Sequence, residues 1–314
     1  MTRTGAKLKS WIGRRLRAEP PRSKSLMVTV LGDSIAPRAR GLWLSEMIEL
    51  LRPFAMDERL VRTSAFRLAE EGWIEARRHG RRSRYRLTDS GVQRIENAYR
   101  RIYDPPPQSW DGRWTMVIAN GGNGAGDRAQ LRKELEWEGF ALLASGVALH
   151  PCADGEALAA TLQRLGLRAE TMVLEAREQA KLGAMSSRRL LAECWKLDEL
   201  AARYQHFVRS FEPLLSLLES GGDEAEGELV FAAQTLLIHA YRRVVLHDPR
   251  LPVDLLPAQW PGMQAYELCR SIYLRSFETV ALFLDRHLEQ DEQRSRTATF
   301  YQRFGGLKPG AFKA

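Results

Sequence analysis

Residues 57–91 of the chain are DERLVRTSAFRLAEEGWIEARRHGRRSRYRLTDSG, and this stretch decides the fold of the first third of the sequence. Asp57 is a favoured helix N-cap, and the apolar residues after it repeat at helical spacing until Gly72 ends the segment. Residues 73–77 and 83–87 then alternate in the way that paired strands do. A helix followed by such a hairpin is typical of the second half of a winged helix-turn-helix.

Two further helices are predicted before this stretch. An apolar run at 26–31 indicates the first, which ends near Gly32, and apolar residues at helical spacing within 44–51 indicate the second. We therefore assign residues 25–104 to a winged-helix domain. Residues 1–24 carry eight Lys and Arg against one acid and form a basic arm ahead of this domain.

The positive charge of the chain is concentrated in its first third. Residues 1–104 hold 23 Lys and Arg against 12 Asp and Glu, a net charge of +11, whereas the whole chain carries +8. The remainder of the chain is therefore slightly acidic. This distribution is expected of a nucleic-acid-binding module that is attached to a regulatory or dimerising region.

A DNA-binding surface is predicted on the helix and hairpin of residues 57–91. A recognition helix needs one apolar face toward its own domain and one polar, basic face toward base edges and phosphates. The hairpin carries six arginines within positions 77–86, which favours contact with a phosphate backbone or a minor groove over a merely solvated surface. The residues that we predict to contact DNA are Arg59, Arg62, Thr63, Ser64, Arg67, Arg77, Arg81, Arg82 and Arg84.

The rest of the chain follows three consecutive prolines at 105–107, which cannot continue a helix and stiffen a linker. Residues 110–182 show the order strand, helix, strand, strand, helix, strand, which is typical of a ferredoxin-like βαββαβ domain. Only helical periodicity follows in 187–290, which predicts an all-helical effector or dimerisation domain, and 291–314 form a C-terminal tail. The expected fold class is α+β with these three domains.

Composition argues against several classes of function. The three cysteines lie far apart, without a Cys-x-x-Cys motif or a histidine at metal-ligand spacing, so we expect neither disulfides nor a metal site, and a reduced cytoplasm fits. No apolar run is long enough for a membrane span. Glu193 and His206 could form an acid–base pair, but nothing in the sequence brings them together or supplies a nucleophile. We expect no catalytic residues, no cofactor and no enzymatic activity.

Short blocks of sequence carry a family resemblance over almost the whole chain after the basic arm. They are DSIAPR at 33–38, ERLVRTS at 58–64, GW at 72–73, GRRS at 80–83, YRRIY at 99–103, WDGRW at 110–114, ECW at 193–195, HAYRRVVL at 239–246, LLP at 255–257, WPG at 260–262 and FYQRFGGL at 300–307. The blocks resemble the PaaX family, the repressors of phenylacetic acid degradation operons. The resemblance implies a repressor that phenylacetyl-CoA, as effector, releases from double-stranded operator DNA, and we expect a homodimer.

An effector site is expected in the last third of the chain. A coenzyme A ester needs cations for its phosphates and an apolar pocket for its acyl group. Arg242 and Arg243 could supply the cations, and the pocket could be lined by Trp195, Tyr241, Trp260 and Tyr266. Helix bracing and core packing are alternative roles for the same residues. Two other functions stay open: an effector-independent architectural or RNA-associated protein, and an enzyme that acts on a coenzyme A ester.

Overall fold

The computed structural model describes residues 2–38, 41–107, 109–119, 125–179, 182–183, 185–219, 226–288 and 302–306. The chain forms two compact units. The first unit holds Met1–Pro105, His206–Leu246 and Gln264–Ala314, and the second holds Pro106–Gln205 and His247–Met263. The range 187–290, expected to form one helical domain, contributes to both units.

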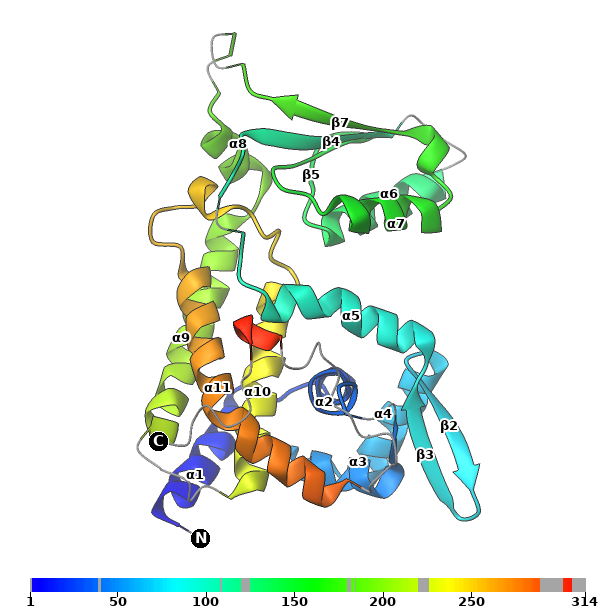
Figure 1. Ribbon diagram of the computed structural model, residues 1–314, viewed down its shortest axis with the longest axis vertical. Helices are drawn as coiled ribbons and strands as arrows, with labels where there is room; N and C mark the ends of the chain where they lie inside the picture. Colours follow the sequence, from blue (N-terminus) through cyan, green and yellow to red (C-terminus); the bar gives the residue numbers. More distant parts are fainter. Residues whose placement is uncertain are drawn as a thin grey trace. The chain divides into compact units, whose positions relative to one another are not determined.

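The first unit begins with helices and a small sheet (Figure 1). Its elements up to Pro105 are α1 (Arg3–Ala18), α2 (Ser23–Val30), the π-helix η1 (Leu31–Ile35), β1 (Gly41–Trp43), α3 (Leu44–Leu51), the 3-10 helix η2 (Arg52–Phe54), α4 (Glu58–Glu70), β2 (Ile74–His79), β3 (Arg82–Leu87) and α5 (Asp89–Tyr103). The three strands form an antiparallel sheet in the order β1-β3-β2, in which Ile74 lies opposite Leu87.

The short strand β1 was not predicted from the sequence. It is only three residues long, so its sequence shows no measurable alternation, and it exists because it pairs with β3. A Cβ atom on Gly41 would lie 2.6 Å from the carbonyl oxygen of Tyr85. A side chain at this position would therefore disturb the pairing.

Later helices complete the first unit. They are α9 (Leu197–Glu219) from His206 onward, α10 (Gly227–Val245), α11 (Pro261–His287) from Gln264 onward, and the 3-10 turn η6 (Arg303–Gly305). The expected basic arm is the helix α1, which buries Leu8, Trp11 and Ile12. The Trp11 ring meets Phe211 of α9 edge-on, with 5.5 Å between ring centroids. The arm is thus a packed helix whose basic side chains mostly face solvent.

A buried ion pair lies in the core of the first unit. Arg303, which is 0% exposed, donates hydrogen bonds to the carboxylate of Asp33 (2.9 Å), to its backbone oxygen (2.9 Å) and to the hydroxyl of Tyr273 (2.5 Å). The carboxylate of Asp33 also accepts from the hydroxyl of Tyr103 (2.6 Å) and the amide of Gln234 (3.3 Å). These residues come from η1, α5, α10, α11 and η6, so the ion pair joins segments that lie 270 residues apart in the sequence.

The second unit is built around a four-stranded sheet. Its elements are β4 (Arg113–Ala119), α6 (Ala125–Trp137), β5 (Ala141–Ala144), β6 (Val147–His150), α7 (Gly155–Arg164), η3 (Arg168–Glu170), β7 (Thr171–Arg177), α8 (Ser187–Cys194), the first turns of α9, η5 (Val253–Leu255) and the start of α11. The strands are antiparallel in the order β5-β6-β4-β7. This order confirms the ferredoxin-like arrangement.

Each face of this sheet has its own apolar core. The helices α6 and α7 lie together on one face (Figure 1), where Val117 of β4 packs among Leu131, Leu135, Leu158 and Leu162. On the other face, Trp114 of the same strand packs against the α8 region and the segment around η5; the residues buried with it include Leu149, Leu191, Trp195, Leu251, Leu255 and Leu256. Trp114 and Val117 are an odd number of residues apart, so the alternation of the strand directs them into different cores.

Candidate nucleic-acid interface

The helix α4 begins after the predicted N-cap, and the predicted apolar face is the one that is buried. The side chain of its N-cap, Asp57, accepts a hydrogen bond from the backbone N–H of Leu60 (2.7 Å). Val61, Ala65 and Leu68 are fully buried, so they fix the helix on its domain. The residues of α4 that face solvent include Arg59, Arg62, Thr63 and Arg67. Four of the five residues that we predicted on this helix therefore lie on its exposed face.

Ser64 does not lie on that face, and the expectation that it contacts DNA is corrected here. Its side chain is 3% exposed, and its hydroxyl donates to the hydroxyl of Ser23 in α2 (3.0 Å). Ser64 follows Val61 by three residues and precedes Leu68 by four, so the helical repeat places it on the buried face with them. A small polar residue can occupy such a place only because a hydrogen-bond partner meets it there.

The exposed arginines of α4 differ in how far their charge is compensated. Arg62 pairs with Glu58 one turn earlier, at 2.5 Å between Nη2 and Oε1. Arg59 and Arg67 form no ion pair with any residue that the structure describes. An exposed pair of this kind is worth little in water, so a phosphate or a base edge can replace Glu58 as the partner of Arg62.

Two large apolar side chains on α4 are exposed, which was not predicted from the sequence. Phe66 is 63% exposed and Leu60 is 40% exposed, although both belong to residue types that are usually buried. Phe66 lies one turn after Arg62 and Thr63 and shares their side of the helix. The sequence did contain the signal, because Phe66 falls outside the apolar repeat of Val61, Ala65 and Leu68.

The β2–β3 hairpin presents a dense group of arginines. It turns at Gly80, whose φ of 60° is a backbone conformation that glycine adopts without strain. Arg77, Arg78, Arg81 and Arg82 are exposed. The acid of the hairpin is Glu75, which lies 3.1 Å from Arg86 and 3.5 Å from Arg77. We call these four hairpin arginines, together with Arg59, Arg62 and Arg67, the basic surface.

An indole ring orders part of the hairpin. The guanidinium of Arg82 lies over the ring of Trp43, 4.0 Å from its centroid, and that of Arg84 lies at 5.7 Å. His79 meets the same ring edge-on at 5.5 Å. Contact of a cation with an aromatic face is attractive. Trp43, which the sequence analysis did not single out, therefore positions Arg82.

The six residues of the predicted effector site are divided between the two units. In the first unit, Tyr241 is 2% exposed and packs on Phe207, at 5.3 Å between centroids. Tyr266 is 4% exposed, and burial raises the pKa of its hydroxyl to about 12. Arg242 donates to the hydroxyl of Thr29 (3.0 Å), and burial lowers its pKa, whereas Arg243 is exposed. Both tyrosines are thus core residues.

The remaining two lie in the second unit. The indole N–H of Trp195 donates to the carbonyl oxygen of Gly139 (2.9 Å), and Trp260 is half-buried against Tyr204. The imagined acid–base pair is also divided, since Glu193 pairs with Arg189 (2.9 Å) and His206 pairs with Glu19. These contacts fit the alternative roles of the predicted effector residues, which are core packing and helix bracing.

The described part of the chain contains no group of three or more His, Cys, Asp or Glu side chains that could hold a metal ion. None of its helices combines the length and the apolar character that crossing a bilayer requires.

Comparisons with known proteins agree with the sequence blocks. Three family models match: PaaX-like protein at 22–91, PaaX protein central Cas2-like domain at 107–189 and PaaX-like protein C-terminal domain at 195–286. Transcriptional repressor PaaX of Escherichia coli (strain K12) is 37% identical over 304 residues, which cover 96% of each chain. A solved structure, uncharacterized protein Rv0674 from Mycobacterium tuberculosis, is 24% identical and covers 75% of this chain and 90% of its own, with a TM-score of 0.44. The chain belongs to the PaaX family.

Proposed function

We propose that this chain is a DNA-binding transcriptional repressor of aromatic acid catabolism genes, such as those for phenylacetate. The observation that carries the proposal is the basic surface, whose arginines are exposed and have few acidic partners among the described residues. A similar protein bears the name of a transcriptional repressor, which supports the same function.

In this proposal α4 is the recognition helix of a winged helix-turn-helix and the β2–β3 hairpin is its wing. The exposed face of α4 enters the major groove, where Arg59 or Arg62 donates to the acceptors of guanine. Phe66 contacts the methyl group of a thymine, because an apolar side chain in the groove has no better partner. The wing arginines neutralise phosphates and release counterions, which gives affinity without base selection.

The repressor binds as a homodimer and is released by an aryl-acyl-CoA such as phenylacetyl-CoA. A dimer places two recognition helices on two half-sites, so its operator is a palindrome. Linkage requires that effector and operator weaken each other by the same factor, and a typical coupling is about 1–3 kcal/mol.

The test begins with selection of an operator from a random duplex pool by the full-length protein. Fluorescence anisotropy then measures affinity for that duplex and for bulk DNA at physiological salt. We expect the selected duplex to bind at least about a thousandfold more tightly and phenylacetyl-CoA to release it. Equal affinity for both DNAs would instead identify an effector-independent architectural protein.

A further inference from the structure

The second unit contains a groove that none of the six predicted effector residues lines. It lies between α7 and β7 and has a volume of about 770 Å³. Small-molecule sites span roughly 300–1,000 Å³, so the groove is large enough for an organic ligand. Its middle part is lined by apolar side chains, which include Leu158, Leu162, Ala159 and Val173, and its polar and charged lining residues include Arg113, Thr115, Arg168, Thr171 and Glu175. From Thr171 to Glu175 the strand beside it extends for about 13 Å, longer than a phenyl ring with a two-carbon acid.

One end of the groove carries a cation. Arg168 lines this end and is exposed, and no described residue forms an ion pair with it. The hydroxyl of Thr171 lies at the same end but donates to the carbonyl oxygen of Leu167 (2.8 Å). An anionic group on a ligand would therefore find its partner at Arg168.

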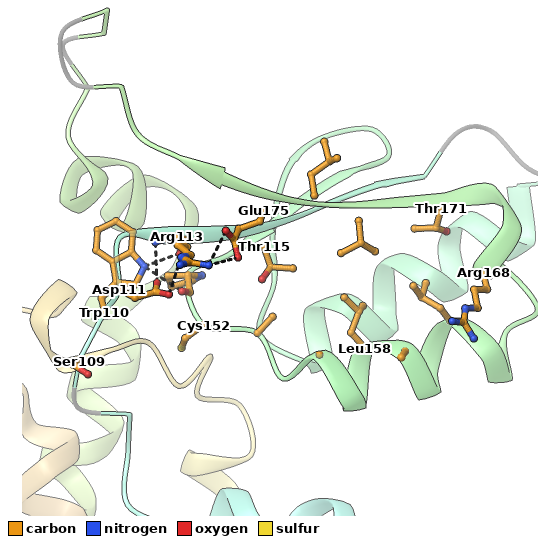
Figure 2. A pocket seen from close by; sticks show the side chains of 17 residues that line it. Ser109, Trp110, Asp111, Arg113, Thr115, Cys152, Leu158, Arg168, Thr171 and Glu175 are labelled. Carbon is orange, nitrogen blue, oxygen red and sulfur yellow. Dashed lines mark hydrogen bonds and ion pairs between the residues drawn. The ribbon is translucent and has the colours of Figure 1, made fainter.

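The opposite end of the groove is aromatic and its charges are already paired. Figure 2 shows Trp110 and Arg113 at this end, Arg168 at the other, and Leu158 between them on α7. Arg113 donates to both carboxylate oxygens of Glu175 (2.9 Å each) and lies 3.4 Å from Asp111. With one arginine between two carboxylates, this end repels an anion and suits a neutral ring.

The thiol in the wall of the groove is unreactive. Burial raises the pKa of Cys152 to about 11, so its sulfur is protonated at neutral pH, and it donates to the carbonyl oxygen of Arg250 (3.3 Å). A neutral thiol neither attacks a thioester nor repels it. The groove is therefore suited to hold an acyl thioester without cleaving it.

We propose that this groove binds the acyl and pantetheine arm of a coenzyme A thioester, with the aryl group at Trp110 and the phosphates outside near Arg168. The apolar side chains can pack against the methylene groups of the arm, and polar lining residues such as Thr115 lie where its amides need partners. The length exceeds that of a free aromatic acid, and the unpaired cation lies at the anionic end of the ligand. This inference rests on the proposed function, since the thioester is the effector proposed above, and it assigns the effector site to the second unit.

The test compares two neighbouring residues of β7 that point to opposite faces of the sheet. Val173 is 46% exposed and lines the groove, whereas Met172 is 58% exposed and does not line it. Isothermal titration measures phenylacetyl-CoA binding to the full-length protein carrying Val173→Glu or Met172→Glu. A carboxylate in the groove should weaken binding by about tenfold or more, and the Met172 variant should bind like the unchanged protein.

A second matched pair tests the charged end. Arg168→Ala should weaken binding of phenylacetyl-CoA, while Arg164→Ala on α7, outside the groove, should not. Coenzyme A alone and phenylacetate alone serve as further probes, and each should bind more weakly than the thioester. Equal binding of free phenylacetate would overturn the thioester assignment.

The outcomes separate this inference from the proposed function. If Val173→Glu binds the thioester normally and is still released from operator DNA by it, the groove is not the site, but the effector-controlled repressor stands. If the unchanged protein neither binds the thioester nor releases operator, both fail. Operator affinity of every variant without effector, together with circular dichroism, shows that the fold is intact.

Discussion

Arg81 and Arg82 of the wing and Arg303 of η6 carry the same charge in opposite surroundings. The wing arginines face solvent, where water keeps a guanidinium stable and a phosphate can reach it. Arg303 is fully buried, and Asp33, Tyr273 and neighbouring carbonyl groups satisfy it. A charge removed from water must be paired and hydrogen-bonded. The partners of an arginine, and not its charge alone, therefore distinguish a structural residue from one that faces solvent.

The largest effect should come from removing the buried charge. Arg303→Met leaves the Asp33 carboxylate buried without its cation, so the free energy of unfolding should fall by about 3–5 kcal/mol. Urea unfolding measures this loss. The matched change in the wing, Arg81→Met, should stay within about 0.5 kcal/mol of the unchanged protein. Equal losses in the two variants would remove the contrast, and recovery of stability in Arg303→Met with Asp33→Leu would show that the unpaired carboxylate is the cause.

A recognition arginine should act on DNA binding and not on folding. Arg62→Ala should weaken operator binding by about 1–3 kcal/mol if the side chain reads a base, with a smaller effect on random DNA. Arg59→Ala is the companion variant. Anisotropy titrations on both DNAs measure the difference, and an equal loss on both would identify a phosphate contact instead.

Wing arginines should change the salt dependence of binding. Replacing Arg81 and Arg82 with Ala removes positive charge, so operator and random DNA should both bind more weakly. The slope of log K against log salt should fall by about 0.9 for each phosphate contact that is lost. Binding measured over a range of salt concentrations gives this slope, and an unchanged slope would show that the hairpin does not touch DNA.

His239 represents a third environment, that of a buried base with no acidic partner among the described residues. Burial, with Arg242 and Arg243 nearby, lowers its pKa to about 3, and its Nδ1 lies 3.0 Å from the hydroxyl of Thr29. Below about pH 6.5, His239 binds a proton in the unfolded chain but not in the folded chain. The free energy of unfolding therefore falls as the pH falls from about 6.5 toward 3. Between pH 7 and 5.5, the unchanged protein should lose about 1 kcal/mol more than His239→Gln in urea unfolding. Parallel pH profiles of the two proteins would contradict this assignment.

The smallest effect should come from the exposed ring on α4. If Phe66 contacts a thymine methyl group, replacing that thymine with deoxyuridine should cost about 0.8 kcal/mol, the value of one buried CH₂ group. The same replacement should cost nothing in Phe66→Ala, and competition titrations with the two duplexes measure both values. A cost that persists in the variant would place another residue against that methyl group.

Much of the fold follows from local patterns in the sequence. The N-cap at Asp57, the turn at Gly80 and the alternation in β4 specify their elements within a few residues, so α4, the hairpin and the ferredoxin-like order could be predicted. The charge of the first third likewise pointed to the surface that binds DNA in our proposal. These features depend on neighbours in the chain, and the sequence contains them directly.

Other features exist only because distant segments meet. The strand β1 needs β3 beside it, and the buried hydroxyl of Ser64 has a hydrogen-bond partner only because Ser23 of α2 lies opposite it. Likewise, Arg303 is paired only because η6 packs against Asp33, which lies 270 residues earlier in the sequence. Local periodicity cannot contain such partners, because the free energy of burying a polar group depends on which group lies opposite it. The sequence by itself determined most of the helices and strands and the position of the charge. The tertiary structure decided the pairing of β1 and which of the polar residues are paired inside and which face solvent.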